Sequence, residues 1–353
     1  MKFSALRARK WGWGVLAVAI ILVAALGLLR DTRTATEPYR KTTIAMGSVV
    51  THTVYDTNAE KARTAAENAA AGITALEQRI SCKRSDSEIS AINRDGHGTV
   101  SADTAALLTA ALQVQQETNG LYNICTRPLT LLWDFDAEVF TIPAKADLQN
   151  ACALVRAAHC TVNGTAVTLL PQGAGIDLGS AGKGAACDVA VNAYKSAGCT
   201  AGIAAVGGSI GLYGKKPDGS AWRLGVRDPN GDASAQLGTL TLHEGFVSTS
   251  GTYEKVREYQ GTAYHHLLNP SSGMPCESDL VSATVVCDNG ALSDILATAC
   301  VLLGRTDGTA LLQAHNADYV LVTRDGIVQV SDGLQDAFSL TASGYTLAAS
   351  NGS

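Results

Sequence analysis

No two of the nine cysteines in this 353-residue chain are separated by just two residues. Because CxxC pairs are the usual ligands of structural zinc and iron–sulfur sites, neither kind of site is supported. Basic residues are also scarce beyond the N-terminus: the net charge is −5 and no long basic block follows, which argues against a nucleic-acid partner. No segment repeats at a fixed period, which argues against a solenoid.

Charged residues make up only 17% of the chain, whereas hydrophobic residues make up 46%. A chain of this length and composition can bury a large core, as one large domain or two ordinary ones. The cysteine count is odd, so at least one thiol stays unpaired even if the folded part lies outside the cytoplasm.

The N-terminal segment 1–30 is predicted to be a membrane anchor. Four basic residues precede an apolar run over 11–29, which as a helix is roughly 28 Å long and matches a bilayer core. The run is longer than a typical signal-peptide core and lacks a small-x-small cleavage site, so an uncleaved anchor is favoured over a signal peptide. The basic flank predicts that the rest of the chain lies on the extracytoplasmic side of the cell membrane. The first cysteine is Cys82, which excludes a lipid-modified cysteine after the run.

Residues 31–42 are expected to be a tether, and 43–345 the folded part. Apolar periodicity predicts helices at 58–80, 102–118, 143–159 and 291–304, and at the end of the glycine-rich segment 173–198. Alternating patterns predict strands at 42–56, 165–170, 201–214, 222–228 and 280–287, and a C-terminal hairpin turning at 324–326. The stretches 246–255 and 264–275 are predicted to be polar loops. Mixed helices and strands with hairpin signals predict an α+β or mixed α/β domain.

The stretch "IDLGSAGKGAACD" (176–188) places Gly179, Gly182, Lys183 and Gly184 where a helix begins. Such a turn lets backbone amides approach a phosphate, and the helix N-terminus favours its negative charge. The spacing is neither that of a P-loop nor that of a dinucleotide-binding fingerprint. An equally good interpretation is a turn that needs glycine for positive φ and tight packing.

The stretch "YHHLLNPSSGMP" (264–275) carries His265 and His266 before an Asn-Pro turn. Either histidine could act as a general acid or base near neutral pH. For one histidine taken alone, a strand-end side chain facing water is the better interpretation.

The stretch "LSDILATAC" (292–300) places Asp294 and Thr298 four residues apart, so on a helix they share one face. Two oxygens on one face suit Mg²⁺, whose coordination is usually completed by substrate phosphates and water. The alternative is that Asp294 caps the helix and Thr298 bonds back to the carbonyl four residues earlier. Taken together, the three stretches indicate a phosphate-handling site.

These motifs, in this order, resemble those of the FAD:protein FMN transferases, the ApbE family. "DLGSAGKGAACD" is similar to that family's D-L-G-G/S-x-A/G-K-G stretch, "STSGTYEK" to its S-T-S-G-x-Y loop, and "YHHLLNPSSGMP" to its H-H-I-I-D/N-P stretch. "LSDILATACVLLG" resembles its metal-binding helix, while "AMGSVV" and "SDSEISAIN" resemble two N-terminal segments. The resemblance runs from about residue 43 to the C-terminal hairpin.

The resemblance implies a T-fold-like architecture and the transfer of FMN from FAD to a threonine or serine hydroxyl of an exported or membrane flavoprotein. Mg²⁺ would be required and AMP released. It implies that His266 and Lys183 are catalytic, and that Ser180, Asp294 and Thr298 hold the metal, Ser180 through its carbonyl. The residues implied to contact FAD are Met46, Cys82, Leu121, Tyr122, Asn123, Asp177, Lys183 and Leu268, the last through its backbone.

Three residues depart from the family pattern: Asn123 stands for an aspartate, Arg127 for a glycine, and Cys82 for a common aromatic residue. Two other functions use the same residues. An FAD pyrophosphatase would give FMN and AMP with water in place of the acceptor hydroxyl, and a non-catalytic, membrane-tethered protein would only bind flavin.

Overall fold

The computed structural model describes residues 37–348. The predicted anchor (1–30) lies outside them, as does the first half (31–36) of the predicted tether. Strand β1 (Tyr39–Ala45) begins within the tether segment, so residues 39–42 belong to the sheet. In the part of the chain that the structure describes, no helix is long and apolar enough to cross a membrane.

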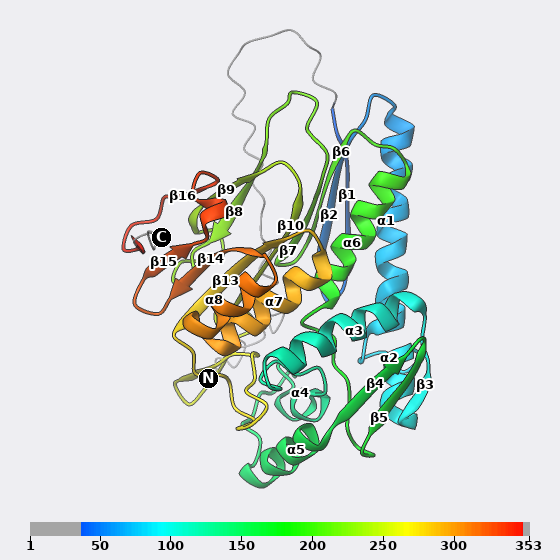
Figure 1. Cartoon of the computed structure of the whole chain (residues 1–353), viewed down its shortest axis with the longest axis vertical. Helices are drawn as coiled ribbons and strands as arrows, with labels where there is room; N and C mark the ends of the chain where they lie inside the picture. Colours follow the sequence, from blue (N-terminus) through cyan, green and yellow to red (C-terminus); the bar gives the residue numbers. More distant parts are fainter. Residues whose placement is uncertain (1–36, 349–353) are drawn as a thin grey trace, which may run out of the picture.

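The centre of the fold is a nine-stranded sheet in the order β1-β2-β6-β7-β10-β13-β14-β15-β17 (Figure 1). Adjacent strands in this sheet are antiparallel, except for β15 and β17, which are parallel. After β1, its strands are β2 (Ser48–Tyr55), β6 (Ala201–Val206), β7 (Ser209–Tyr213), β10 (Gly245–Gly251), β13 (Leu280–Cys287), β14 (Asp318–Thr323), β15 (Ile327–Val330) and β17 (Thr346–Leu347).

Helices α1 (Ala59–Ile80), α6 (Gly182–Ser196) and α7 (Gly290–Leu303) cover one face of this sheet (Figure 1). The opposite face packs against a three-stranded sheet made of β8 (Trp222–Arg227), β9 (Gln236–Leu242) and β16 (Phe338–Leu340). Strand β6 illustrates how both faces of the central sheet are buried. Ala204 and Val206 join the core under the helices, whereas Ile203 and Ala205 join the core under the small sheet.

A smaller lobe lies at one end of the central sheet (Figure 1). It contains α2 (Glu88–Asp95), α3 (Ala102–Glu117), α4 (Arg127–Trp133), α5 (Lys145–Ala157), β3 (His97–Thr99), β4 (His159–Asn163) and β5 (Ala166–Leu170). Trp133 anchors an apolar cluster in it, stacks on Phe135 and donates to the Gly273 carbonyl at 2.7 Å. The remaining elements are the hairpin β11 (Arg257–Tyr259) and β12 (Thr262–Tyr264), helix α8 (Arg305–Ala314) and the short 3-10 helix η1 (Asp332–Leu334).

The predicted mixed α/β class is confirmed, and most predicted helices and strands are present. The region 42–56 is a hairpin rather than one strand, because Met46 and Gly47 both adopt positive φ, 54° and 65°, at a two-residue turn. The prediction that 246–255 is a loop is wrong for its first half, which is strand β10. Its hydroxyl groups form hydrogen bonds inside the fold, Ser248 with Ser209 and Thr249 with Thr284. Because these polar side chains keep hydrogen-bond partners, the strand can be buried despite its polar sequence. Helices α2, α4 and α8 were not predicted.

Candidate active site

Helices α6 and α7 meet backbone to backbone at Gly184 and Gly290. A Cβ atom on Gly184 would lie 1.9 Å from the Gly290 carbonyl oxygen, and one on Gly290 would lie 2.4 Å from the Gly184 carbonyl oxygen. No side chain fits at either position. The alternative interpretation of the glycine-rich turn is therefore right about tight packing, but wrong about positive φ, which none of Gly179, Gly182 and Gly184 adopts.

The N-terminus of α7 is capped by residues other than Asp294. Asn289 is the N-cap and accepts from the Leu292 amide at 2.8 Å. Asp188, on α6, accepts from the Gly290 and Ala291 amides, both at 2.8 Å. These bonds satisfy the exposed amides of the first turn. Asp294 lies in the second turn, so the capping alternative for Asp294 is wrong.

Asp294 is a buried carboxylate aimed at the glycine-rich turn. The residue is only 1% exposed. Its Oδ2 accepts a hydrogen bond from the Gly184 amide at 3.0 Å, and its Oδ1 lies 3.5 Å from Lys183 Nζ. Burial raises the pKa of Asp294, and the nearby Lys183 charge and Gly184 amide oppose that rise. A second cation beside a buried carboxylate would stabilise its charged form further.

Thr298 follows Asp294 on the same face of α7, and the residue is buried. In the described structure its hydroxyl pairs with Ser250 Oγ on β10 at 3.0 Å, and not with the carbonyl of Asp294. The back-bonding alternative is therefore also wrong. Asp294 and Thr298 both use their side chains toward groups outside α7.

Three turns converge on Lys183, which also donates to the Gly179 carbonyl at 3.4 Å. The Lys183 Cδ atom is 3.3 Å from the Cβ position of Gly207, in the β6–β7 turn. Met46 Sδ, from the β1–β2 turn, is 3.9 Å from the Cβ position of Gly182. The predicted Met46 thus lies beside Gly182, the residue before Lys183, although the two are far apart in sequence.

The segment 121–124 runs beside the glycine-rich turn. Tyr122 is buried, and its hydroxyl lies 3.0 Å from Ser180 Oγ. Asn123 Oδ1 accepts from the Cys125 amide at 2.7 Å, so this side-chain oxygen serves the local turn. Leu121 is half-buried next to them.

Asp177 connects this segment to α4. Its Oδ2 accepts from Thr130 Oγ1 at 2.8 Å, its Oδ1 accepts from the Gly179 amide at 2.9 Å, and Arg127 lies 3.9 Å away. Burial raises the pKa of the Cys82 thiol to about 12, and the negative charge of Asp177 acts in the same direction. Two of the departures from the family pattern, Cys82 and Arg127, therefore meet at Asp177.

His266 is held by a defined hydrogen bond. Its Nδ1 lies 3.0 Å from the Glu254 carbonyl oxygen, which can only accept, so the proton is on Nδ1 and Nε2 is free to accept. Burial, then the charges of Lys255 and Lys183, lower the pKa of His266 to about 3. The buried Nδ1 of His265 has no partner among the described residues. The ring of His266 is therefore oriented by the backbone through Nδ1, whereas Nδ1 of His265 is not.

Leu268 is predicted to act through its backbone. Its side chain packs in the apolar cluster around Trp133, and its backbone forms an isolated bridge with Pro275. The side chain is thus committed to the core, and only the main chain is available.

Sequence reasoning missed three residues near His266: Lys83, Asp136 and Lys255. Lys83 pairs with Asp136, and Arg257 ties the same loop by donating to the carbonyls of Phe135 and Ala137, at 3.1 and 2.8 Å. The pKa of Asp136 is lowered by its hydrogen bond to Lys83 and by the charges of Lys255 and Lys83, whereas burial opposes that shift. Lys255 has a positive φ of 45°, which is uncommon for a residue with a side chain and marks a constrained position. The one feature of the sequence that could have pointed to Lys255 is its position directly after the motif "STSGTYE" (248–254).

The family sequence model "ApbE family" matches residues 46–321. The chain belongs to the ApbE family. A curated FAD:protein FMN transferase of Klebsiella pneumoniae (strain 342) is 29% identical over 279 residues, which cover 77% of this chain and 86% of the relative. The FAD:protein FMN transferase of Treponema pallidum (strain Nichols) is 28% identical over 346 residues, covering 92% and 94%. The crystal structure of the ApbE protein from Thermotoga maritima superposes with a TM-score of 0.77 at 26% identity, covering 85% of this chain and 99% of that one.

The predicted metal ligands of this ApbE protein, Ser180, Asp294 and Thr298, include only one charged side chain. Among residues 37–348, no three His, Cys, Asp or Glu side chains gather in a metal-binding arrangement. Asp294 is the one carboxylate of the predicted set, whose other members are the Thr298 hydroxyl and the Ser180 carbonyl. Such a set fits Mg²⁺ if substrate phosphates and water supply the other ligands.

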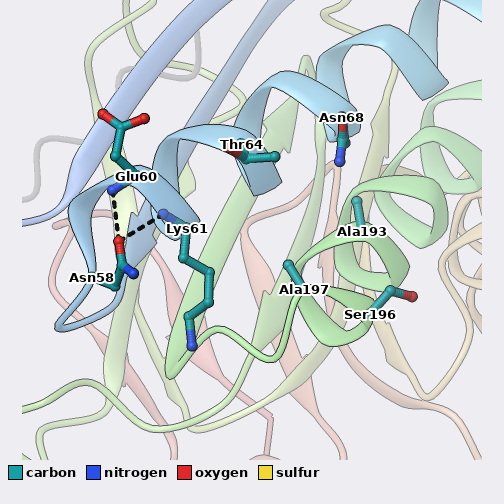
Figure 2. A pocket seen from close by; sticks show the side chains of 8 residues that line it. All are labelled: Asn58, Glu60, Lys61, Thr64, Asn68, Ala193, Ser196 and Ala197. Atoms are coloured by element: carbon teal, nitrogen blue, oxygen red, sulfur yellow. Dashed lines mark hydrogen bonds between the residues drawn. The ribbon is translucent and has the colours of Figure 1, made fainter.

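A separate groove lies between the N-terminal half of α1 and the C-terminal end of α6 (Figure 2). Its volume is about 720 Å³, and it is open to solvent. Asn58 caps α1 there through the Glu60 and Lys61 amides, and Lys61 pairs with Asp56 at 2.7 Å. No predicted site residue lines it, since the glycine-rich turn is at the other end of α6.

Proposed function

We propose that this ApbE protein transfers FMN from FAD to a threonine or serine hydroxyl of a partner flavoprotein and releases AMP. The observation that carries the proposal is the convergence of His266, Lys183 and Asp294 from three distant motifs around one glycine-rich turn. The names of the curated relatives support the same reaction class.

The chemistry follows from the positions of these groups. The acceptor hydroxyl oxygen forms a bond to the FMN phosphorus, and the bond between that phosphorus and the bridging pyrophosphate oxygen breaks. His266 Nε2 takes the hydroxyl proton, and AMP leaves with the bond's electron pair. Lys183 stabilises the negative charge that develops on the phosphoryl oxygens.

Asp294, Thr298 and the Ser180 carbonyl would hold Mg²⁺, which when bound neutralises pyrophosphate charge. The burial of the Asp294 carboxylate beside the glycine-rich turn supports this assignment. Met46, Cys82, the 121–123 segment, Asp177 and the Leu268 backbone would form the FAD pocket.

We also propose that the 1–30 segment anchors the protein in the cell membrane with the folded part on the extracytoplasmic side. Its acceptor would then be an exported or membrane flavoprotein with a Thr- or Ser-containing attachment motif. The apolar run and its basic flank support this location.

The deciding experiment incubates the protein with FAD, Mg²⁺ and a candidate flavoprotein, and then measures the mass of the acceptor. An acceptor heavier by one FMN less water supports transfer. Free FMN and AMP with an unmodified acceptor would instead identify an FAD pyrophosphatase, and unchanged FAD would identify a flavin-binding protein.

A further inference from the structure

Two pairs of hydroxyl groups join strand β10 to helix α7. Ser248 Oγ lies 2.8 Å from Ser293 Oγ, and Ser250 Oγ lies 3.0 Å from Thr298 Oγ1. Ser293 and Thr298 lie on either side of Asp294 along the helix. The two pairs have the same chemistry and join the same two elements, but only the second includes a predicted cation ligand.

The Ser248 pair belongs to a closed, buried network. Ser248 Oγ also lies 3.0 Å from Ser209 Oγ, and Ser293 donates to the Gly290 carbonyl at 2.8 Å, so the hydrogen of the Ser248–Ser293 pair comes from Ser248. All three serines are 1% exposed or less. The bonds of this network run between β7, β10 and α7, so the network holds the helix on the sheet.

The Ser250 pair is different because Thr298 has a second task. A hydroxyl group has one hydrogen and two acceptor lone pairs, and a cation can take only a lone pair. The hydrogen must then go to an acceptor, and an isolated helical threonine would place it on the carbonyl four residues earlier. In the described structure the partner of Thr298 is Ser250 instead.

We propose that Ser250 is a positioning residue for the cation: its Oγ accepts the Thr298 hydrogen and so turns a Thr298 lone pair toward the metal. This inference rests on the cation site of the proposed function. Groups that orient a metal ligand typically change metal affinity about 10- to 100-fold when removed. Ser250 does not itself touch the cation in this arrangement.

The test compares Ser250→Val with Ser250→Thr in the full-length protein. Both substitutions add a β-branched side chain that suits a strand, and only the threonine keeps a hydroxyl. The probe is Mn²⁺ in the presence of FAD and without acceptor, with free Mn²⁺ measured by electron paramagnetic resonance. We expect Ser250→Val to weaken Mn²⁺ binding about 10-fold and Ser250→Thr to leave it within about twofold.

The matched control is Ser248→Ala, which removes the same kind of contact between the same two elements. It should lower the thermal midpoint of unfolding without changing Mn²⁺ affinity, whereas the Ser250 effect appears in Mn²⁺ affinity. The double variant Ser250→Val/Thr298→Ala should bind Mn²⁺ no more weakly than Thr298→Ala alone. Ser250 acts only through the Thr298 hydroxyl, so its substitution has no further effect once that hydroxyl is gone.

Two outcomes separate the inference from the function on which it rests. If Thr298→Ala weakens Mn²⁺ binding while Ser250→Val does not, the positioning role of Ser250 is wrong and the cation site stands. If Asp294→Ala and Thr298→Ala both bind Mn²⁺ as the wild type does, the cation site itself is wrong.

Discussion

The Asp294 carboxylate accepts a hydrogen bond from the Gly184 backbone amide at 3.0 Å, across the crossing of two helices. The same carboxylate lies 3.5 Å from the side chain of Lys183, the residue before that amide. One residue of α7 therefore fixes the position of both the main chain and the cationic side chain of the glycine-rich turn. Substitutions at this crossing on either α6 or α7 should therefore alter the geometry of the glycine-rich turn.

Replacing Asp294 tests the metal assignment directly. Asp294→Ala removes the one carboxylate of the oxygen set, so we expect Mg²⁺-dependent turnover of FAD to fall by roughly 100-fold or more. Asp294→Asn is the matched control, since it keeps the shape and an acceptor for the Gly184 amide but loses the charge. An Asp294→Ala variant with wild-type turnover would rule the assignment out.

Replacing Gly184 tests the helix crossing. A methyl group there would overlap the Gly290 carbonyl, so Gly184→Ala should lower the free energy of unfolding by about 3 kcal/mol. Gly182→Ala is the control in the same turn, because its Cβ would meet the Ile80 side chain at 3.2 Å, where a small shift relieves the contact. Urea unfolding measures both. Equal losses for the two variants would contradict a special role for the crossing.

The protonation of His266 should not change near neutral pH in the free protein. Its pKa is lowered to about 3, so the neutral ring predominates throughout pH 5 to 8 and no proton is gained in that window. Lys255→Met removes a positive charge that lowers this pKa, so the pKa of His266 should rise in the variant. Titration of the ring protons by nuclear magnetic resonance measures both. A midpoint near 6.5 in the wild type would contradict the described environment.

A buried histidine outside the site should make stability fall in acid. His52, on β2, is 1% exposed; its Nδ1 lies 2.5 Å from the Tyr194 hydroxyl, and burial followed by the charge of Lys41 lowers its pKa to about 4. Between pH 6.5 and 4 the unfolded chain binds a proton at His52 that the folded chain does not. Stability is therefore present above pH 6.5 and falls as the pH drops, by about 3 kcal/mol from this group.

The comparison variant for that prediction is His52→Phe, which cannot take up the proton. The difference in unfolding free energy between wild type and variant isolates His52 from the carboxylates that titrate in the same range. That difference should change with pH between 6.5 and 4 and be flat above 7. A pH-independent difference would show that His52 titrates normally in the folded state.

Local patterns predicted most of the fold because they reflect local physics. The periodicity of 58–80 describes one face of one helix, and that prediction is confirmed, whereas the predicted strand 201–214 is the antiparallel pair β6 and β7 joined by a turn at Gly207-Gly208. Strand β10 was missed because its polarity is compensated by hydroxyls on β7, β13 and α7, which no local pattern contains. The T-fold-like architecture and the membrane anchor remain predictions.

By itself, the sequence determined which residue types are available at each motif and, through their order, the ApbE family. It could not decide between a helix cap and a cation ligand for Asp294, because both need only a carboxylate near a helix N-terminus. Tertiary structure excluded the cap by giving it to Asn289 and Asp188, and the cation role of Asp294 remains a prediction. It alone also brought Lys83, Asp136 and Lys255 to His266, because such contacts depend on the packing of distant segments.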